Sequence, residues 1–94
     1  MLTIIDLKKI IIESNILQKY GLEKIGIFGS FARGEEFNDI DFYIDEDKIN
    51  YLKVEELQAE LEQITNKKVD LMQKKFANPI VLHRAQKDMI YVTA

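Results

Sequence analysis

The pattern of apolar and polar positions predicts helices and strands in alternation. In two long stretches the apolar residues recur every three or four positions, which is typical of amphipathic helices, and in shorter stretches they form runs or alternate, which is typical of strands. Glycine, asparagine and proline separate these stretches. In chain order we expect a helix ending at Gly21, a strand at 24–28, a strand at 39–45, a helix ending near Asn66, a strand at 68–72, a short helix after Asn78 and a strand at 89–92. This order predicts an α/β (α+β) fold, a small mixed β-sheet packed with helices.

Local signals indicate where these helices begin and end. Thr3 and Asp6 have the spacing of a capping box, and Gly21 would end the helix that follows them. Asn78 before Pro79 is typical of an N-cap followed by the first helical residue. The apolar residues of the long second helix lie at i, i+3, i+7 and i+10 and form one face: Val54, Leu57, Leu61 and Ile64.

Acidic and apolar residues alternate along the second predicted strand. Because successive side chains point to opposite faces, Ile40, Phe42 and Ile44 would pack, and the other face would carry Asp39, Asp41, Tyr43 and Asp45. Side chains two apart on a strand start about 7 Å from each other, where two negative charges repel by about 2 kcal/mol at an effective dielectric of about 20. Mg²⁺ binds one or two such carboxylates together with substrate phosphates and waters, so the pattern indicates a metal site. The alternative is the solvated face of an edge strand.

A glycine-bounded turn precedes this strand. Gly29 permits a positive φ and a close approach of the backbone to a ligand, and Ser30 offers a hydroxyl and an N–H where a helix begins. Arg33 would stand one turn later, where its guanidinium could reach a polyphosphate, and Gly34 would close the turn. By itself a Gly-Ser pair is more often a plain turn. Beside the aspartates, it predicts a site for the phosphates of a nucleoside triphosphate.

Residues 29–35 followed by 38–41 resemble the signature of the DNA polymerase β-like nucleotidyltransferase superfamily. Within it the chain is most similar to the minimal nucleotidyltransferases, the MNT proteins commonly encoded beside HEPN-domain partners as antitoxins. The loop between Ser30 and Asp39 is slightly shorter than in many members. The resemblance implies a nucleotidyltransferase-like fold and covers nearly the whole chain, with further matches in the family's order at 19–21, 69–71 and 90–92.

The resemblance also implies a third carboxylate. Family members carry one on the next strand, and Asp70 occupies that position, with Val69 and Leu71 pointing the other way. If that strand lies beside the preceding one, Asp70 can face the same cleft as the two earlier aspartates. The alternative pairs Asp70 with Lys67 or Lys68 at a strand end.

This resemblance implies a Mg²⁺-dependent transfer of a nucleoside monophosphate, AMP when ATP is the substrate. Asp39, Asp41 and Asp70 would be catalytic and would bind two Mg²⁺ ions, and Asp70 could also act as the general base. A hydroxyl would attack the α-phosphorus and pyrophosphate would leave. The nucleotide-binding residues would be Gly29, Ser30 and Arg33.

Composition narrows the classes of function. We expect one domain, residues 1–94, with one modest core. The absence of cysteine excludes disulfides and thiolate metal sites, and the single histidine, His83, cannot form a histidine cluster. No apolar run approaches the roughly 20 residues of a membrane span and no secretory signal is present, so we expect a cytoplasmic protein without a membrane partner. A net charge of −3 disfavours stable binding to nucleic acid.

Three hypotheses of function follow. In the first, the chain transfers AMP to a hydroxyl on a protein, and the resemblance implies a tyrosine of a HEPN-type toxin in a type VII-like toxin–antitoxin pair. In the second, it neutralises that partner by binding alone. In the third, it nucleotidylates a small molecule. Surplus apolar residues fit core packing, or else a partner protein in a homo- or hetero-oligomer: Ile10, Ile11, Ile12, Phe31, Phe37 and Phe76.

Overall fold

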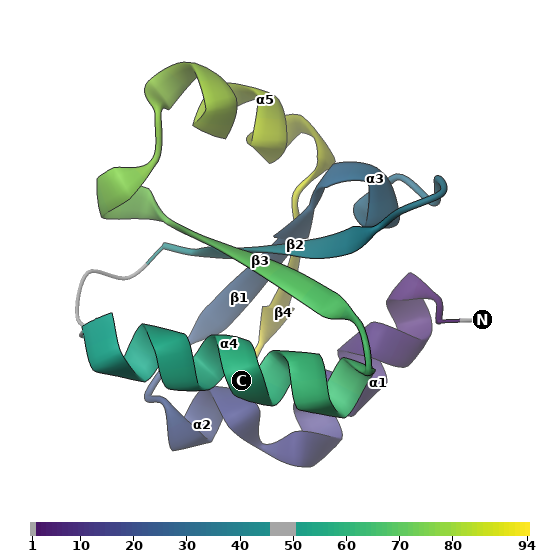
Figure 1. Ribbon diagram of the computed structural model, residues 1–94, viewed down its shortest axis with the longest axis vertical. Helices are drawn as coiled ribbons and strands as arrows, with labels where there is room; N and C mark the ends of the chain where they lie inside the picture. Colours follow the sequence, from purple (N-terminus) through teal and green to yellow (C-terminus); the bar gives the residue numbers. More distant parts are fainter. Residues whose placement is uncertain (1, 46–50) are drawn as a thin grey trace.

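The computed structural model describes residues 2–45 and 51–94. Within these residues, helices and strands alternate much as predicted (Figure 1). In chain order the elements are α1 (Ile4–Ser14), α2 (Ile16–Lys19), β1 (Lys24–Phe28), α3 (Gly29–Ala32), β2 (Asp39–Ile44), α4 (Tyr51–Thr65), β3 (Lys68–Gln73), the 3₁₀ turn η1 (Lys74–Phe76), α5 (Pro79–Asp88) and β4 (Ile90–Thr93).

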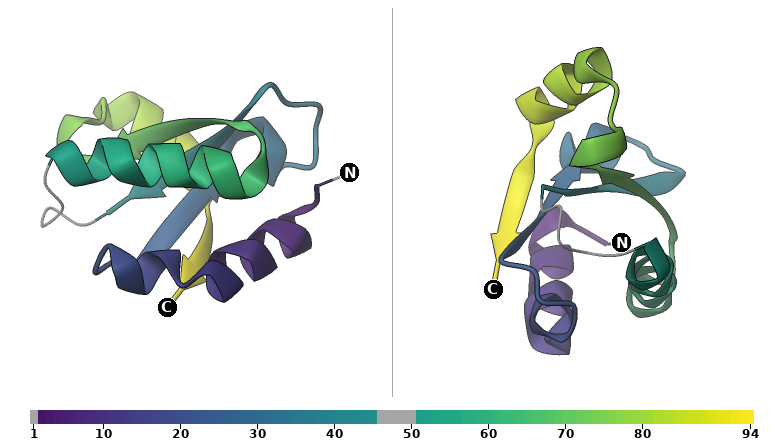
Figure 2. Two further views of the ribbon diagram at one scale, coloured as in Figure 1. Left: turned by 60° about the horizontal axis from the view of Figure 1, so that its bottom comes forward. Right: turned by 90° about the vertical axis from the view of Figure 1, so that its left-hand side faces the viewer.

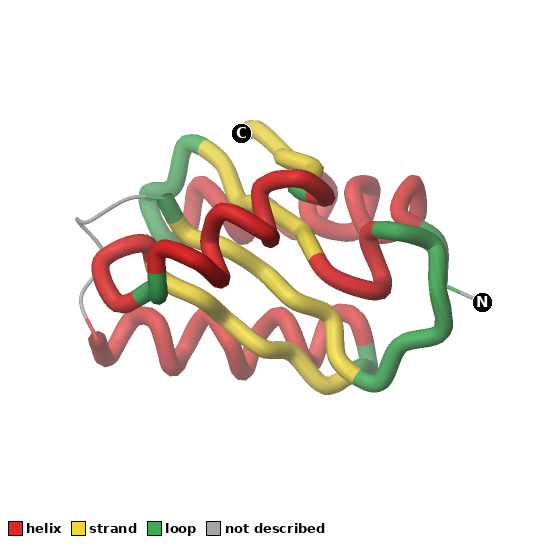
Figure 3. The backbone as a smooth tube through the Cα atoms, turned by 90° about the horizontal axis from the view of Figure 1, so that it is seen from above, coloured by secondary structure: helices red, strands yellow, loops and turns green. Residues whose placement is uncertain are grey.

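The described strands form one sheet in the order β3-β2-β1-β4. β2 and β3 are parallel, whereas β1 is antiparallel to both β2 and β4. The prediction of a mixed sheet is therefore confirmed. α1, α2 and α4 cover one face of the sheet, and α5 lies over the other (Figures 1 and 2). Figure 3 looks down on this second face and shows α5 crossing over the strands.

The hydrophobic core fills the space between the sheet and the layer of α1, α2 and α4. Because side chains alternate along a strand, β2 sends every second residue into this core. Ile40, Phe42 and Ile44 are fully buried there, as predicted. The helices contribute mainly leucine and isoleucine, and the most deeply buried of these are Leu7, Ile11, Ile16, Leu17, Leu57 and Leu61.

The N-terminal helix differs from the prediction. Its capping box is present, since the Thr3 hydroxyl accepts from the Asp6 N–H at 3.2 Å and the Asp6 carboxylate accepts from the Thr3 N–H at 3.1 Å. However, the helix does not continue to Gly21, because it breaks at Asn15 (φ 55°) into α1 and α2. Asparagine adopts this left-handed conformation more easily than most residues. Leu17 consequently enters the core from α2.

The C-terminal elements agree with the prediction. The Asn78 side chain accepts from the Ile80 N–H at 2.9 Å, and Pro79 is the first residue of α5. β4 pairs with β1 and forms one edge of the sheet. In the described ranges, none of the helices combines the length and the apolar character needed to cross a membrane.

Candidate functional site

The predicted acidic residues lie on the face of the sheet that carries α5. Asp39 and Asp41 belong to β2, and Asp70 belongs to the neighbouring parallel strand β3. The register pairs Asp41 directly with Asp70. Neighbouring strands lie about 4.8 Å apart, and paired residues point to the same face, so these two carboxylates stand side by side. The expectation that β3 lies beside β2 with Asp70 facing the same side is confirmed.

The surroundings of Asp41 shift the pKa of its carboxyl group. Burial raises its pKa, and the negative charges of Asp70 and Asp39 raise it further, while Arg33 acts in the opposite direction. Asp70 is exposed, and Asp39 and Asp41 are half-buried. None of the three forms an ion pair within residues 2–45 and 51–94. The alternative pairing of Asp70 with Lys67 or Lys68 is therefore absent from the described ion pairs.

The donor chemistry of these side chains fits a hard divalent cation. Adjacent carboxylates in a partly buried position repel each other, and Mg²⁺ needs only one or two protein carboxylates when phosphates and waters supply the other oxygens. As the side chains stand, however, no three acidic or histidine groups of the described residues are close enough together to hold a metal ion. The pairing of Asp41 with Asp70 thus matches a site that the phosphates of a substrate would complete.

Gly29 connects the glycine-bounded turn at residues 29–34 to the aspartates. It has φ 79°, and a Cβ atom at this position would overlap the carboxylate of Asp41. The pairing of Phe28 with Asp41 explains the closeness, because α3 begins directly after Phe28. Two separate constraints therefore require glycine: the left-handed backbone and the space that Asp41 occupies. Gly34 also has a positive φ, 74°, but a Cβ there would meet nothing.

Ser30 and Arg33 both follow Gly29: Ser30 lies within α3, and Arg33 is the C-cap of this helix. Ser30 is half-buried in α3, and its carbonyl accepts from the Glu35 N–H at 3.0 Å. The Arg33 guanidinium donates to Glu35 at 3.0 Å and to Asp88 at 2.7 Å. Both contacts raise the pKa of Arg33. The side chain predicted to grip phosphate is therefore held by two carboxylates, one of them at the end of α5.

Sequence reasoning missed Asp88. It lies 55 residues after Arg33 and at the last position of α5. A lone aspartate near the end of a helix is ordinary in sequence, and only the packing of α5 beside α3 brings it to the turn. Nothing in the amino-acid sequence predicts the contact between Arg33 and Asp88.

The other end of β2 does not belong to the site. Tyr43 is almost fully buried, and its hydroxyl donates to Asp45 at 3.3 Å. Asp45 also forms ion pairs with Lys24 at 3.7 Å and with Lys74 at 3.3 Å. The prediction that the whole acidic face of this strand opens to a cleft or solvent is thus wrong at Tyr43, because this side chain is buried and its hydroxyl is bonded to Asp45. Asp45 is a neutralised structural carboxylate.

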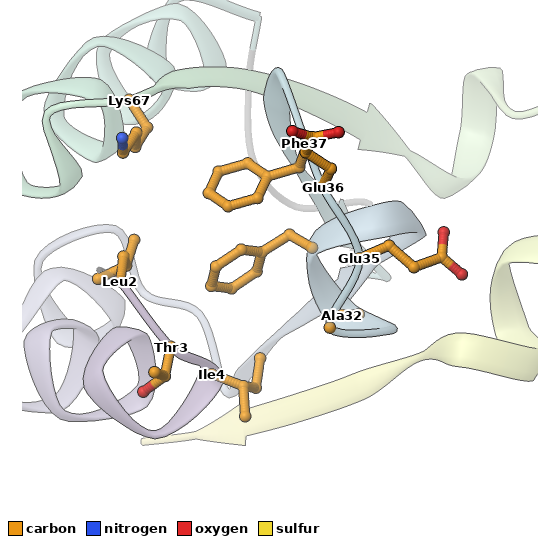
Figure 4. A pocket seen from close by; sticks show the side chains of 10 residues that line it. Leu2, Thr3, Ile4, Ala32, Glu35, Glu36, Phe37 and Lys67 are labelled. Atoms are coloured by element: carbon orange, nitrogen blue, oxygen red, sulfur yellow. The ribbon is translucent and has the colours of Figure 1, made fainter.

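A pocket of about 600 Å³ lies on the other side of α3 (Figure 4). Phe31 and Phe37 pack edge to face inside it, with ring centroids 4.8 Å apart. In Figure 4 the ring of Phe37 faces Leu2 and Lys67, and Glu35 points away. None of the predicted catalytic or nucleotide-binding residues lines this pocket. The pocket adjoins the hydrophobic core and is separate from the aspartates.

The chain matches a known family over most of its length. The family model described as polymerase beta, nucleotidyltransferase matches residues 8–93. A putative protein adenylyltransferase of Methanocaldococcus jannaschii is 39% identical over 98% of this chain and 100% of its own length. The protein adenylyltransferase MntA of Thermococcus cleftensis is 31% identical over 98% of each chain.

Solved structures share the fold. A toxin–antitoxin complex with AMP-PNP contains a chain that superposes with a TM-score of 0.73 at 22% identity, covering 90% of this chain and 71% of that one. A complex of a tri-AMPylated Shewanella oneidensis HEPN toxin with its MNT antitoxin contains a chain that superposes with a TM-score of 0.69 at 20% identity. The match covers 92% of this chain and 68% of that one. With the paired aspartates and the glycine turn, these matches confirm the resemblance to the minimal nucleotidyltransferases: the chain belongs to the polymerase β nucleotidyltransferase family.

Proposed function

We propose that this nucleotidyltransferase is a Mg²⁺-dependent protein adenylyltransferase that moves AMP from ATP to a tyrosine hydroxyl of a HEPN-domain toxin. The observation that carries the proposal is the register of Asp41 with Asp70 beside the Gly29 turn. The protein adenylyltransferases that resemble the chain over nearly its full length support the reaction class. The AMPylated HEPN toxin bound to an MNT antitoxin supports the class of acceptor.

The chain's own residues have distinct roles in this reaction. The turn at Gly29 and Ser30 would hold the triphosphate through backbone N–H groups, and Arg33 would reach it once released from Asp88. Mg²⁺ would be held by Asp39, Asp41 and Asp70 and would offset the phosphate charge.

The transfer itself is a displacement at phosphorus. The acceptor oxygen bonds to the α-phosphorus, and the bond from that phosphorus to pyrophosphate breaks. Asp70 is the most exposed of the three carboxylates, and besides holding Mg²⁺ it would accept the proton of the hydroxyl. The proton thus moves to Asp70, and pyrophosphate carries away the negative charge of the broken bond.

The test is transfer of label from ATP in the presence of Mg²⁺ to a HEPN-domain protein of the same host. We expect wild type to label the acceptor from the α-phosphate and not from the γ-phosphate, and Asp39→Asn/Asp41→Asn to give no label. Asp45→Asn is the matched control, because it makes the same change on the same stretch of chain at a carboxylate held by Lys24 and Lys74. Equal labelling by wild type and by the double variant would exclude the proposal.

A second candidate is neutralisation of the partner by binding alone. Two observations favour it: Arg33 is engaged by Glu35 and Asp88, and the described carboxylates do not form a ready three-ligand cluster. Under this hypothesis Asp39→Asn/Asp41→Asn still neutralises the toxin in growing cells. Loss of neutralisation by a double variant that still binds the toxin would exclude it.

A further inference from the structure

Charge is distributed unevenly along the chain. Residues 67–94 contain six lysines and arginines and only two aspartates, whereas residues 1–66 contain seven basic and fourteen acidic residues. The net charge of −3 therefore conceals an acidic first part and a basic last part. The basic part includes β3, η1 and α5.

Large apolar side chains are exposed in the same segment. Phe76 is 73% exposed, Ile80 66% and Val81 50%. In α5, residues at i, i+4 and i+7 share a face, so Ile80, Arg84 and Lys87 form a stripe on the side away from the buried Ala85. We call the following set the η1–α5 surface: Lys75, Phe76, Ile80, Val81, Arg84 and Lys87.

The basic groups of this surface are available to a partner. Lys75, Arg84 and Lys87 form no ion pair with any residue that the structure describes, although the Lys75 ammonium lies 5.2 Å from the ring centroid of Phe76. On α1, the exposed Ile5 and Ile12 also lie three or four positions from lysines, and one of these, Lys9, faces Glu13 at 4.0 Å. The η1–α5 surface therefore carries three exposed apolar side chains together with three basic side chains that form no described ion pair.

Both elements of the η1–α5 surface are connected to elements of the candidate site. η1 directly follows β3, the strand that carries Asp70. α5 ends at Asp88, whose carboxylate accepts from Arg33 of the glycine-bounded turn at 2.7 Å. A protein seated on η1 and α5 would therefore lie beside the carboxylates that perform the transfer.

We propose that the η1–α5 surface docks an acidic, amphipathic segment of the protein that accepts the nucleotide. This inference rests on the proposed transfer to a protein. Three unpaired cations select negative charge, and the aliphatic Ile80 and Val81 select apolar side chains. RNA would satisfy the cations and could stack a base on Phe76, but it would leave the aliphatic Ile80 and Val81 uncovered. A protein segment is therefore the occupant that fits the whole surface.

The test measures the affinity of the full chain for a fluorescently labelled HEPN-domain protein of the same host. We expect Ile80→Ser/Arg84→Glu to raise Kd at least about tenfold. The matched control is Ile12→Ser/Lys9→Glu on α1, which also removes one exposed isoleucine and reverses one exposed lysine. Lys87→Glu, a milder change, keeps the test valid if the first variant does not fold, and its effect should shrink as salt is added.

Docking and transfer have separate readouts. Binding by Ile80→Ser/Arg84→Glu within twofold of wild type would overturn the proposed surface, even if wild type labels the acceptor. Binding that depends on the surface without any labelling would keep the docking site and remove the proposed reaction. A labelled single-stranded RNA of 20 nucleotides is the further probe. Binding of this RNA that the surface variant loses, with no effect on the HEPN-domain protein, would overturn the proposal in favour of nucleic acid.

Discussion

The face of the sheet under α1, α2 and α4 differs from the face under α5 in what its side chains contribute. On β2 the residues Ile40 and Phe42 are fully buried in the core, whereas Asp39 and Asp41 on the other face are half-buried and have no ion-pair partner in the described chain. Neighbours in sequence thus serve different purposes. Because a strand alternates, stability and the candidate chemistry can be changed separately by substituting alternate residues.

Two carboxylates show the same difference in electrostatic terms. On the helical side, Glu60 accepts hydrogen bonds from Lys19 and Tyr20, and its pKa is lowered first by the Lys19 bond. On the site side, burial and neighbouring charge raise the pKa of Asp41. The negative charge of Glu60 is thus stabilised by hydrogen-bond donors, whereas that of Asp41 is disfavoured by its surroundings. Carboxylates of the second kind are common where a protein binds a cation or performs acid–base chemistry.

The largest effect on stability is expected from the core side of β2. Phe42→Ala removes a fully buried ring and should lower the free energy of unfolding by about 3–5 kcal/mol. Urea denaturation followed by circular dichroism measures the change. Leu52→Ala is the control, because this side chain is 70% exposed and its loss should cost less than about 0.5 kcal/mol. A similar cost for both variants would mean that Phe42 is not a core residue.

We expect the next largest effect from a substitution of Gly29, compared with the same substitution of Gly34 in the same turn. Gly29→Ala and Gly34→Ala both place a Cβ at a positive φ, which costs about 1–2 kcal/mol. Only Gly29→Ala also displaces the carboxylate of Asp41. We therefore expect it to be the less stable variant and the one that loses label transfer, with thermal unfolding and the α-label assay as measurements. Equal loss of transfer in both variants would show that the turn, and not its contact with Asp41, controls activity.

The spacing of apolar residues predicted most of the fold. Each helix or strand buries one face, and this gives its apolar residues a period that can be recognised without knowing the rest of the structure. The strand at 24–28 and the acidic alternation of β2 follow from local pattern alone. The break at Asn15 did not follow, since the apolar positions up to Leu17 continue a helical period and the left-handed turn depends on how α2 packs.

The candidate site was predictable only in part. Residue types and spacing indicated Gly29, Asp39 and Asp41, which lie close together in the chain. Family resemblance was needed for Asp70, because its register with Asp41 is a property of the sheet. The contact of Arg33 with Asp88 spans 55 residues and was not foreseeable.

The pH dependence of stability should be opposite for the two carboxylates. The raised pKa of Asp41 gives stability that is present below its ordinary pKa of 3.8 and is lost as pH rises through the folded value. The lowered pKa of Glu60 gives stability that is present above its ordinary pKa of 4.5 and is lost as pH falls through the folded value.

At pH 7 without metal, we therefore expect Asp41→Asn to raise the melting temperature. We expect Glu60→Gln to lower stability by less than about 1 kcal/mol, because its ion pair with Lys19 is partly exposed. Thermal unfolding in EDTA buffers between pH 3 and pH 8 measures both variants. Each variant should approach wild type at the acidic end. A loss of stability in both at pH 7 would contradict the electrostatic contrast between the two faces.

The smallest effect concerns the contact that links the site to α5. The ion pair between Arg33 and Asp88 is partly exposed and contributes little to stability, so Asp88→Asn should leave the free energy of unfolding nearly unchanged. If the contact competes with triphosphate for the guanidinium, the same variant should lower the KM for ATP by roughly two- to fivefold and leave kcat unchanged. Steady-state labelling at varied ATP concentration measures both constants.

Glu35→Gln tests whether Asp88 competes with the triphosphate for Arg33 or instead positions Arg33 toward it. Glu35 holds the same guanidinium from a position two residues away, so its loss should leave Arg33 tied to α5 and change KM less than Asp88→Asn does. A higher KM in Asp88→Asn would reverse the interpretation, because it would mean that Asp88 orients Arg33 toward the phosphates. In either case the candidate site depends on a contact with α5, 55 residues further along the chain. The buried face of β2, by contrast, follows from the alternation of residues within the strand itself.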